Sequence, residues 1–315
     1  MRVLPFGLLA ATAFATTLAV GACAQDSVSE GVETRTPATD VQSATTELAS
    51  TGFEAPDNAW RTVEAENLLL VDTVHGRVAI ELYPELAPAH VDRIRTLAKM
   101  GFYDGQKFHR VIDGFMNQTG DPTGTGTGDS GMPDLPPEFT FRRGTDMPVA
   151  LVGAMRTPTG EMATGFYKSL PVATQPSSQA ILTKDGKVEA YGLHCKGVTS
   201  MARTNDPNTA NSQFFLMRGK SPWLDAQYSI WGNTVAGHDV LEKIQLTEVD
   251  GQPIEHTPDV MEDVTLASEL PEAERPVVRV LDTQSDAFLE MLETQKEGDA
   301  YPEICDVRVP VEIGT

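Results

Sequence analysis

The segment FHRVIDGFMNQTGDPTGTGTGDSG, residues 108–131, constrains the fold of this chain more than any other stretch. It contains Gly126-x-Gly128-x-x-Gly131, the spacing of a nucleotide-binding glycine loop. Such a loop binds phosphate only where its glycines end a strand and open a helix whose N-terminus holds the phosphate. Here the glycines run into a proline-rich stretch that forbids the required helix, with Pro133, Pro136 and Pro137. We therefore exclude a dinucleotide-binding loop.

The composition indicates an acidic globular protein. Of the 315 residues, 40% are apolar, which is enough to bury a core. The 45 acidic and 24 basic side chains give a net charge of -21, and no cluster of Lys or Arg offsets it. Because nucleic acids are polyanions, we expect no nucleic acid partner. The sequence also gives no reason to expect a cofactor.

Residues 1–24 have the order of a secretory signal peptide, with an early Arg2, an apolar segment and then small residues. Two processing schemes remain open. Ala22-Cys23-Ala24 fits a cleavage site before Gln25, whereas Val20-Gly21-Ala22-Cys23 resembles a bacterial lipobox with lipidation at Cys23, which we slightly favour. A membrane-anchor helix is a third alternative. We expect an exported, periplasmic protein, either soluble or lipid-anchored to a membrane.

The next residues carry clear local patterns. Residues 25–57 are predicted to form a flexible polar linker, because residues 25–52 are acidic and lack apolar periodicity. Residues 67–85 alternate apolar and polar positions around His75-Gly76, which predicts a β-hairpin. Residues 87–100 change to helical spacing, with one apolar face made of Val91, Ile94, Leu97 and Ala98.

Two motifs follow in a fixed order. The first comprises Phe108-His109-Arg110-Val111-Ile112, Gly114-Phe115-Met116, Gln118 and Gly120-Asp121. The second, within residues 197–244, comprises Ser200-Met201-Ala202, Pro207-Asn208-Thr209, Ser212-Gln213-Phe214-Phe215 and Trp223-Leu224-Asp225. Together they resemble the two signatures of the cyclophilin family of peptidyl-prolyl isomerases. The resemblance covers roughly residues 66–268 and lapses between about 132 and 196.

The resemblance implies a mainly β fold, a closed eight-stranded antiparallel β-barrel capped by two helices. Residues 87–100 and 238–245 lie where those helices belong. The isomerase domain would span residues 58–270, with an insertion at about 132–196. Residues 271–315 read as strand, helix and strand, and we expect this C-terminal extension to pack on the outside of the barrel. A disordered tail is the alternative.

The chemistry of such an isomerase needs no nucleophile, metal or proton acceptor. The barrier of roughly 18–20 kcal/mol comes from amide resonance. When the amide twists, the proline nitrogen gains a lone pair that a fixed cationic donor can hydrogen-bond. Arg110 is our candidate donor, because a guanidinium stays charged and presents several N–H groups in a rigid plane. The resemblance implies that Gln118 supports Arg110, so these two are the predicted catalytic residues.

The resemblance also implies a set of substrate-binding residues. An apolar pocket for the proline ring would consist of Phe115, Met116, Phe215 and Leu224. Taken singly, these four would be ordinary core residues of a barrel. Around the pocket, the backbone at Ala202 and Arg203 would pair with the peptide. Gln213 would line a neighbouring subsite, and Trp223 would form the rim.

Two positions depart from the family pattern. Tyr228 stands where well-studied members have a histidine, and Arg203 replaces an asparagine in a loop that is one residue longer. A tyrosine keeps a flat ring with a hydrogen-bonding tip, so we expect an altered rate or substrate preference with activity retained. Family members bind cyclosporin through the tryptophan that matches Trp223, and we expect this chain to bind it with reduced affinity.

Other catalytic constellations have little support. None of the six histidines has a partner at helical metal-ligand spacing. His194 and Cys195 are adjacent, and adjacent residues on a strand point to opposite faces. We therefore predict no metal site. Ser200 and Ser212 lack the glycine-x-serine-x-glycine elbow of a hydrolase, so a covalent mechanism is not expected.

The three cysteines need an explanation in an exported protein, because one must stay unpaired. Lipidation of Cys23 would account for the odd one. Cys195 and Cys305 could then form a disulfide that closes a loop of about 110 residues. The alternative is two unpaired cysteines that behave as small buried hydrophobic residues.

The sequence thus predicts a peptidyl-prolyl cis-trans isomerase that acts on proline-containing segments of exported proteins. The alternative is a catalytically weak cyclophilin-like module that binds peptides or acts as a chaperone. Arg110 and Gln118 favour the enzyme, because peptide binding alone has little need for a charged donor. We expect a monomer that contacts the membrane only through a lipid anchor, if it has one.

Overall fold

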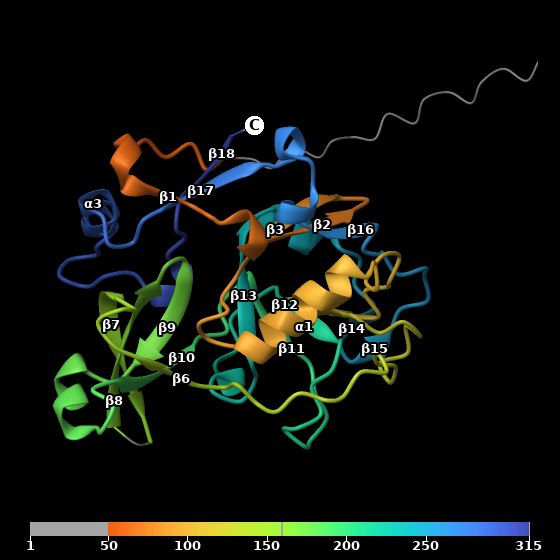
Figure 1. The fold of residues 1–315 in the computed structure, drawn as a ribbon, viewed down its shortest axis with the longest axis horizontal. Coiled ribbons are helices and arrows are strands. Elements are labelled where there is room, and N and C mark those ends of the chain that lie inside the picture. Colours follow the sequence, from red (N-terminus) through yellow and green to blue (C-terminus); the bar gives the residue numbers. More distant parts are fainter. Residues whose placement is uncertain (1–49, 159, 315) are drawn as a thin grey trace, which may run out of the picture. The chain divides into compact units, whose positions relative to one another are not determined.

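The computed structural model describes residues 50–158 and 160–314 (Figure 1). The predicted signal peptide, Cys23 and all but the end of the predicted linker lie outside the described residues. No helix in the described part of the chain is long and apolar enough to span a membrane. The mainly β class predicted from the sequence is confirmed, because the described residues form three β-sheets and only three α-helices.

The main sheet carries both sequence motifs. Its neighbouring strands pair antiparallel, except for a parallel contact between β14 and β4. In spatial order the ten strands are β15 (Gln252–Pro253), β14 (Glu248–Val249), β4 (Arg110–Ile112), β5 (Met116–Thr119), β12 (Phe214–Met217), β11 (Val198–Met201), β13 (Ile230–Ala236), β3 (Gly76–Leu82), β2 (Leu68–Thr73) and β16 (Asp263–Leu266). The predicted hairpin is β2 and β3, joined by the two residues Val74 and His75.

The strand order of the main sheet is open, running from β15 to β16. Lys107 forms an isolated antiparallel bridge with Val260, and the N–H of Phe108 donates to the carbonyl of Asp259. These contacts connect the segment before β4 with the segment before β16. Closure into an eight-stranded barrel stays a prediction, since the sheet has ten strands and an open order.

Two helices pack on the core of the main sheet. Helix α1 is Pro88–Lys99, and α2 is His238–Lys243. Proline is well suited to the first turn of a helix, and Gly101 follows the end of α1 with a positive φ of 64°. Both helices bury apolar residues in the same core cluster as strands β2, β3 and β13, through Val91, Ile94, Leu97, Ala98, Val240 and Leu241.

The insertion at 132–196 contains a second antiparallel sheet, which the sequence analysis did not foresee. Its strands, in spatial order, are β6 (Phe141–Arg143), β10 (Val188–Gly192), β9 (Leu170–Thr174), β8 (Gly160–Tyr167) and β7 (Ala150–Thr157). Strand β7 lies at one edge and pairs only with β8 among the described strands.

The C-terminal extension forms a third sheet with an N-terminal strand. β17 (Val277–Leu281) lies between β1 (Trp60–Thr62) and β18 (Val311–Gly314). The predicted helix is α3 (Asp286–Thr294), which Ser285 caps by accepting a hydrogen bond from the N–H of Phe288. The predicted last strand is shorter than expected: its first part is a 3-10 turn, and the strand begins only after Pro310, which lacks an N–H.

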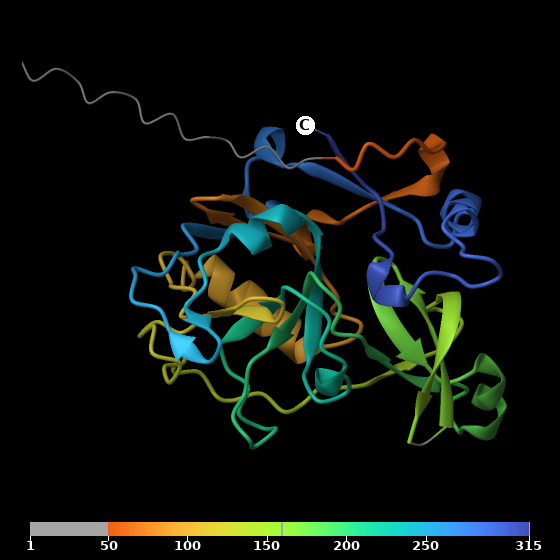
Figure 2. The same cartoon turned by 180° about the vertical axis from the view of Figure 1, so that it is seen from behind.

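The extension lies beside the inserted sheet in both views of the fold (Figures 1 and 2). The ring of Phe288 in α3 meets the ring of Phe166 in β8 edge to face, with 5.7 Å between the centroids. Both rings are buried in one core cluster. The extension therefore packs on the insertion as well as on the main sheet.

Seven 3-10 turns complete the described elements: η1 (Asp57–Ala59), η2 (Ala65–Asn67), η3 (Ser177–Leu182), η4 (Pro222–Leu224), η5 (Ala267–Glu269), η6 (Glu272–Glu274) and η7 (Ile304–Asp306).

A buried polar cluster links the three sheets. Glu81 on β3 is 2% exposed and accepts two hydrogen bonds from the guanidinium of Arg61 on β1, at 2.6 and 2.7 Å. The hydroxyls of Tyr83 and Ser169 also donate to Glu81. Burial, together with the charge of Glu81, raises the pKa of Tyr83 well above its ordinary value, so this hydroxyl stays a donor.

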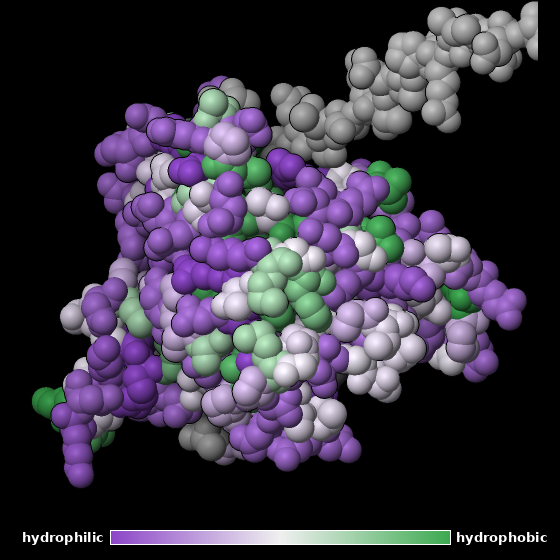
Figure 3. Space-filling model, turned by 45° about the vertical axis from the view of Figure 1, so that its right-hand side comes forward, coloured by the Kyte–Doolittle hydropathy of each residue, from purple (hydrophilic) through white to green (hydrophobic). Residues whose placement is uncertain are grey.

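On the face drawn in Figure 3, hydrophilic residues predominate, as the acidic composition leads one to expect.

Candidate active site

A pocket of about 150 Å³ opens on the main sheet where the two motifs meet. The register of the strands explains why, because Arg110 lies opposite Gln118 and Gln118 lies opposite Phe215. Residues directly opposite each other in an antiparallel pair share a face, so these three form one row across β4, β5 and β12. The full lining is Arg110, Phe115, Met116, Gln118, Ala202, Arg203, Phe215, Leu224 and Tyr228.

Nine of the eleven predicted catalytic and substrate-binding residues thus surround one pocket. The other two lie beside it. Gln213 accepts a hydrogen bond from the side chain of Gln118 at 3.0 Å and donates to the carbonyl of Gly128 at 2.9 Å. Trp223 is 67% exposed, and its ring lies 5.9 Å from that of Phe115. Gln213 therefore fixes the orientation of Gln118, and Trp223 borders the pocket from outside.

The charged side of the pocket is Arg110. Its side chain is exposed, and its guanidinium carbon lies 5.9 Å from the centre of the Phe115 ring. Within residues 50–158 and 160–314, no carboxylate forms an ion pair with Arg110, which lines the pocket. The opposite wall is apolar: Met116, Phe215 and Leu224 are at most 7% exposed.

Arg203 and Tyr228, the two departures from the family pattern, contact each other. The guanidinium of Arg203 lies 4.4 Å from the centre of the Tyr228 ring and 5.5 Å from that of Phe139. It also donates two hydrogen bonds to the carbonyl of Gln227. Stacking on an aromatic face suits a guanidinium. The substituted loop therefore covers the substituted ring, and together they form one side of the pocket mouth.

A buried histidine lies behind the pocket, and the sequence analysis missed its role. His194 Nδ1 lies 2.9 Å from Asp225 Oδ1, and Nε2 lies 2.9 Å from Ser200 Oγ. The imidazole stacks on the ring of Phe215 with 6.2 Å between centroids. Asp225 belongs to the Trp-Leu-Asp motif, which was the only signal for this contact. His194 thus supports Phe215 at the floor of the pocket. No group of three potential metal ligands occurs in the described part of the chain.

The glycine-rich segment after β5 wraps around a carboxylate of the protein itself. Asp121 accepts hydrogen bonds from the N–H groups of Thr123, Thr125 and Gly126 and from the Thr123 hydroxyl. Burial alone would raise the pKa of Asp121, but these and neighbouring hydrogen bonds hold that pKa well below its ordinary value. The N–H groups of this glycine-rich loop therefore bind a carboxylate of the protein itself, whereas the sequence analysis had asked only whether they bind a phosphate.

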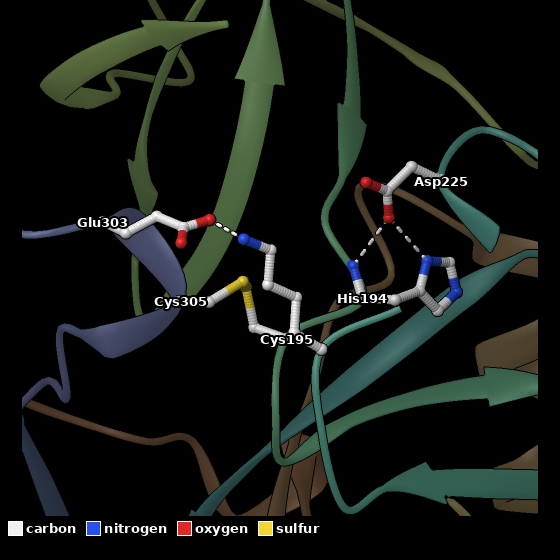
Figure 4. Close-up of a disulfide and its surroundings, with 6 residues drawn as sticks. His194, Cys195, Asp225, Glu303 and Cys305 are labelled. Atoms are coloured by element: carbon white, nitrogen blue, oxygen red, sulfur yellow. Dashed lines mark hydrogen bonds and ion pairs between the residues drawn. A yellow bond between two sulfur atoms is a disulfide. The ribbon is translucent and has the colours of Figure 1, made fainter. Parts of the chain in front are cut away.

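Cys195 and Cys305 form a disulfide, with their Cα atoms 5.1 Å apart (Figure 4). The sequence left open whether these two cysteines form a disulfide or stay unpaired, and in the structure they form the disulfide. Cys195 directly follows His194, and Cys305 lies in η7 of the C-terminal extension. The bridge therefore ties the extension to the segment that supports the floor of the pocket.

Comparisons with known proteins place the chain in a family. The family model described as cyclophilin type peptidyl-prolyl cis-trans isomerase/CLD matches residues 68–266. A Brucella suis protein named "Probable peptidyl-prolyl cis-trans isomerase" is 34% identical over 193 residues, covering 58% of this chain and 73% of that protein. A peptidyl-prolyl cis-trans isomerase of Schizosaccharomyces pombe is 33% identical over 188 residues, covering 59% and 90%.

A solved structure extends the similarity beyond the family model. The cyclophilin AquaCyp293 from Hirschia baltica superposes with a TM-score of 0.72 and 35% identity, covering 83% of this chain and 98% of the other. The mainly β fold and the two motifs are those of a peptidyl-prolyl isomerase. The chain belongs to the cyclophilin family of peptidyl-prolyl cis-trans isomerases, which is the family that its motifs resemble.

Proposed function

We propose that this isomerase binds the proline ring of its substrate in the 150 Å³ pocket and that Arg110 stabilises the twisted amide. One observation carries the proposal: the pocket brings together a wall of buried apolar side chains and a guanidinium that has no ion-pair partner among the described residues. An apolar wall suits a proline ring, which has no N–H to satisfy. A cationic donor beside it suits the lone pair that appears on the proline nitrogen as the amide twists.

The surrounding residues have supporting roles in this proposal. Gln118, oriented by Gln213, would hydrogen-bond the substrate carbonyl and limit the motion of Arg110. The N–H of Ala202 already donates to the carbonyl of Gln213 at 2.8 Å, so other backbone groups at Ala202 and Arg203 would pair with the peptide. Since the barrier is electronic, these residues act by orientation and hydrogen bonding, and no covalent step is required.

The isomerase activity is tested by a protease-coupled assay on a tetrapeptide with an Ala-Pro bond. We expect the purified chain to accelerate the cis-to-trans step well above the uncatalysed exchange, which takes tens to hundreds of seconds. The matched comparison is Phe215→Ala, which removes one apolar wall of the pocket. We expect the variant to have a raised KM, because the proline ring loses a contact made in both the ground and transition states. Background rates for the unaltered chain would contradict catalysis and favour a binding module.

The same rim should bind cyclosporin with reduced affinity. Trp223 is exposed and available for the contact, but Arg203 stacks on the ring of Tyr228, and these two positions differ from the family pattern. We expect inhibition of the isomerase in a dose-response titration to strengthen when Arg203 is replaced by asparagine, the residue common in the family. Equal inhibition of both proteins would show that the Arg203 and Tyr228 stack does not hinder the drug.

We further propose that the clients are exported proteins and that the enzyme works in the periplasm, soluble or lipid-anchored through Cys23. The sequence pattern of residues 1–24 supports export. The disulfide between Cys195 and Cys305 supports it independently, because such bonds persist in oxidising compartments and are rare in reducing ones. Cell fractionation that recovers the chain with reduced thiols from the cytosol would contradict this location.

A further inference from the structure

Arg203 lines the proline pocket with a side chain that several contacts hold in place. Its guanidinium lies 4.4 Å from the centre of the Tyr228 ring and 5.5 Å from that of the Phe139 ring. Nε and Nη2 donate to the carbonyl of Gln227 at 3.2 and 2.9 Å, and Nη1 donates to the carbonyl of Thr204 at 2.8 Å. Two rings and two carbonyls therefore fix a half-buried positive charge beside the pocket.

The insertion contributes to this arrangement. Phe139 lies near its start, and the N–H of the preceding residue, Glu138, donates to the hydroxyl of Ser229 at 2.9 Å. Ser229 directly follows Tyr228 in the chain. This hydrogen bond therefore joins the segments that carry the two rings in contact with Arg203. A guanidinium that is held in advance loses little conformational freedom when it binds a ligand.

Arg203 has no carboxylate partner within residues 50–158 and 160–314, where its hydrogen bonds go to carbonyl groups. The carboxylates of the neighbouring segments bind an asparagine or a histidine: Asp206 binds Asn208, Asp225 binds His194 and Glu138 binds His90. A guanidinium has five N–H groups. Three of those in Arg203 donate to the two carbonyls, so two remain for a further acceptor, and a carboxylate is the acceptor that suits them best.

We propose that Arg203 selects clients that carry an acidic residue close to the proline. The carboxylate of a glutamate or aspartate in the client accepts a charge-assisted hydrogen bond from Arg203 while the proline ring occupies the pocket. This role rests on the function proposed for the pocket, because the proline ring supplies the anchor. The family pattern has an asparagine at this position, whose side chain carries no charge, so the preference would distinguish this chain from relatives that keep the asparagine.

The size of the pocket limits where the acidic residue lies. Arg203 lines the same pocket of about 150 Å³ as Phe215 and Leu224, which belong to its apolar wall. An extended peptide advances about 3.3 Å per residue. A residue more than two positions from the proline would therefore lie beyond a pocket of this size. We expect the acidic residue within two positions of the proline, before or after it.

The charge of the whole chain makes this preference easy to recognise. The net charge of -21 repels acidic peptides at low ionic strength. Without a local cation to receive its carboxylate, a glutamate peptide would bind more weakly than the glutamine peptide of the same length, and added salt would relieve the difference. A contact with Arg203 predicts the opposite on both counts: tighter binding of the glutamate peptide, which weakens as salt screens the pair.

Pairs of peptides that differ in one residue test the role of Arg203. Each peptide has a single proline and carries glutamate or glutamine at one of the two positions before it or the two after it. Exchange NMR measures kcat/KM without an auxiliary protease. At one position we expect kcat/KM to be about fivefold higher for glutamate at low salt, with the ratio approaching one at about 1 M salt. Ratios of one or less at all four positions would overturn the proposal.

Arginine variants identify the cation that is responsible. Arg203→Gln should reduce the ratio at the responsive position to about one or below, and Arg203→Lys should give an intermediate ratio because it keeps the charge without the planar fork. Arg142→Gln removes the same charge from an exposed position of β6 that does not line the pocket, and it should keep the fivefold ratio. A ratio that persists in Arg203→Gln would assign the carboxylate to another cation, such as Arg110, and would overturn the proposal.

Equilibrium binding separates this role from the proposed isomerase function. Fluorescence anisotropy gives the Kd of labelled forms of the same peptides without any turnover. A Kd about fivefold lower for the glutamate peptide, and equalised by Arg203→Gln, would support the role of Arg203 in a chain that isomerised none of them, and that result would contradict the proposed function instead. Should circular dichroism show that Arg203→Gln is unfolded, the salt series on the unaltered chain decides: a glutamate preference that grows with salt would overturn the proposal.

Discussion

Replacement of Arg110 by alanine is expected to lower kcat/KM for an Ala-Pro peptide by about 10²- to 10³-fold, mainly through kcat. The reason is that its proposed hydrogen bond exists only in the transition state, where the proline nitrogen has a free lone pair. Arg110 is exposed and forms no ion pair within the described residues. We therefore expect the free energy of unfolding to change by no more than about 0.5 kcal/mol. The protease-coupled assay and urea unfolding measure the two quantities.

Two other arginine variants sharpen this test. Arg110→Lys keeps the charge but loses the rigid fork of donors, so we expect an activity between those of the unaltered chain and Arg110→Ala. Arg142→Ala removes an exposed arginine of β6, whose partner is Asp185, at a position that does not line the pocket. We expect full activity for it, because exposed ion pairs contribute little. A loss of less than about threefold in Arg110→Ala would argue against its role as the donor.

The row of residues at the heart of the site could be predicted from the sequence, because it depends on local order. The first motif contains both strands of the β4–β5 hairpin, and a tight hairpin fixes which residues face each other. Arg110 and Gln118 therefore share a face, because they are paired across the hairpin. Phe215 joins them because β12 pairs with β5 in the register that the second motif encodes. The pocket residues were carried over from a resemblance, and the register supplies the physical reason for their meeting.

Contacts between distant loops could not be predicted in this way. Arg203 and Tyr228 were recognised as two separate departures, and nothing in their spacing shows that the guanidinium stacks on the ring. His194 was considered only as a metal ligand, because its partners Asp225 and Ser200 meet it through tertiary packing. Each of these contacts depends on how loops of different strands come together, and that information is not present in a local pattern.

The inserted sheet, and the strand partners within the extension, were missed for a related reason. In the insertion, short strands and turns give weak alternation, and which strand forms the exposed edge is decided only by the pairing order. In the extension, β17 pairs with β1, which precedes it by more than 200 residues, so neither strand reveals its partner. The helix α3 was predictable, because its apolar face and its Ser285 cap lie within one short stretch.

The disulfide between Cys195 and Cys305 is the covalent link between these additions and the pocket. Cys195 is 3% exposed, follows His194 directly and belongs to the same core cluster as Phe215. Cys305 packs against that cluster from η7. Loss of the bridge should therefore affect the extension first and the proline pocket last.

The double variant Cys195→Ala with Cys305→Ala is expected to lose about 4–5 kcal/mol of unfolding free energy. The bridge closes a loop with a sequence separation of 110 residues, and its removal frees the unfolded chain to adopt many more conformations. Urea unfolding monitored by tryptophan fluorescence gives the difference. Partial unfolding of residues 271–315 should precede the loss of the main sheet, because the main-sheet core keeps its own apolar contacts.

Reductant provides the internal control for this prediction. Dithiothreitol should destabilise the unaltered chain by a similar amount and leave the double variant unchanged, since only the former has a bridge between Cys195 and Cys305 to reduce. Limited proteolysis should then remove the C-terminal extension from both. The core Ala-Pro peptide should still be isomerised at low temperature, because His194 keeps its bonds to Asp225 and Ser200 without the bridge. A stability loss below about 1 kcal/mol would mean that packing of Phe288 and its neighbours, and not the disulfide, holds the extension in place.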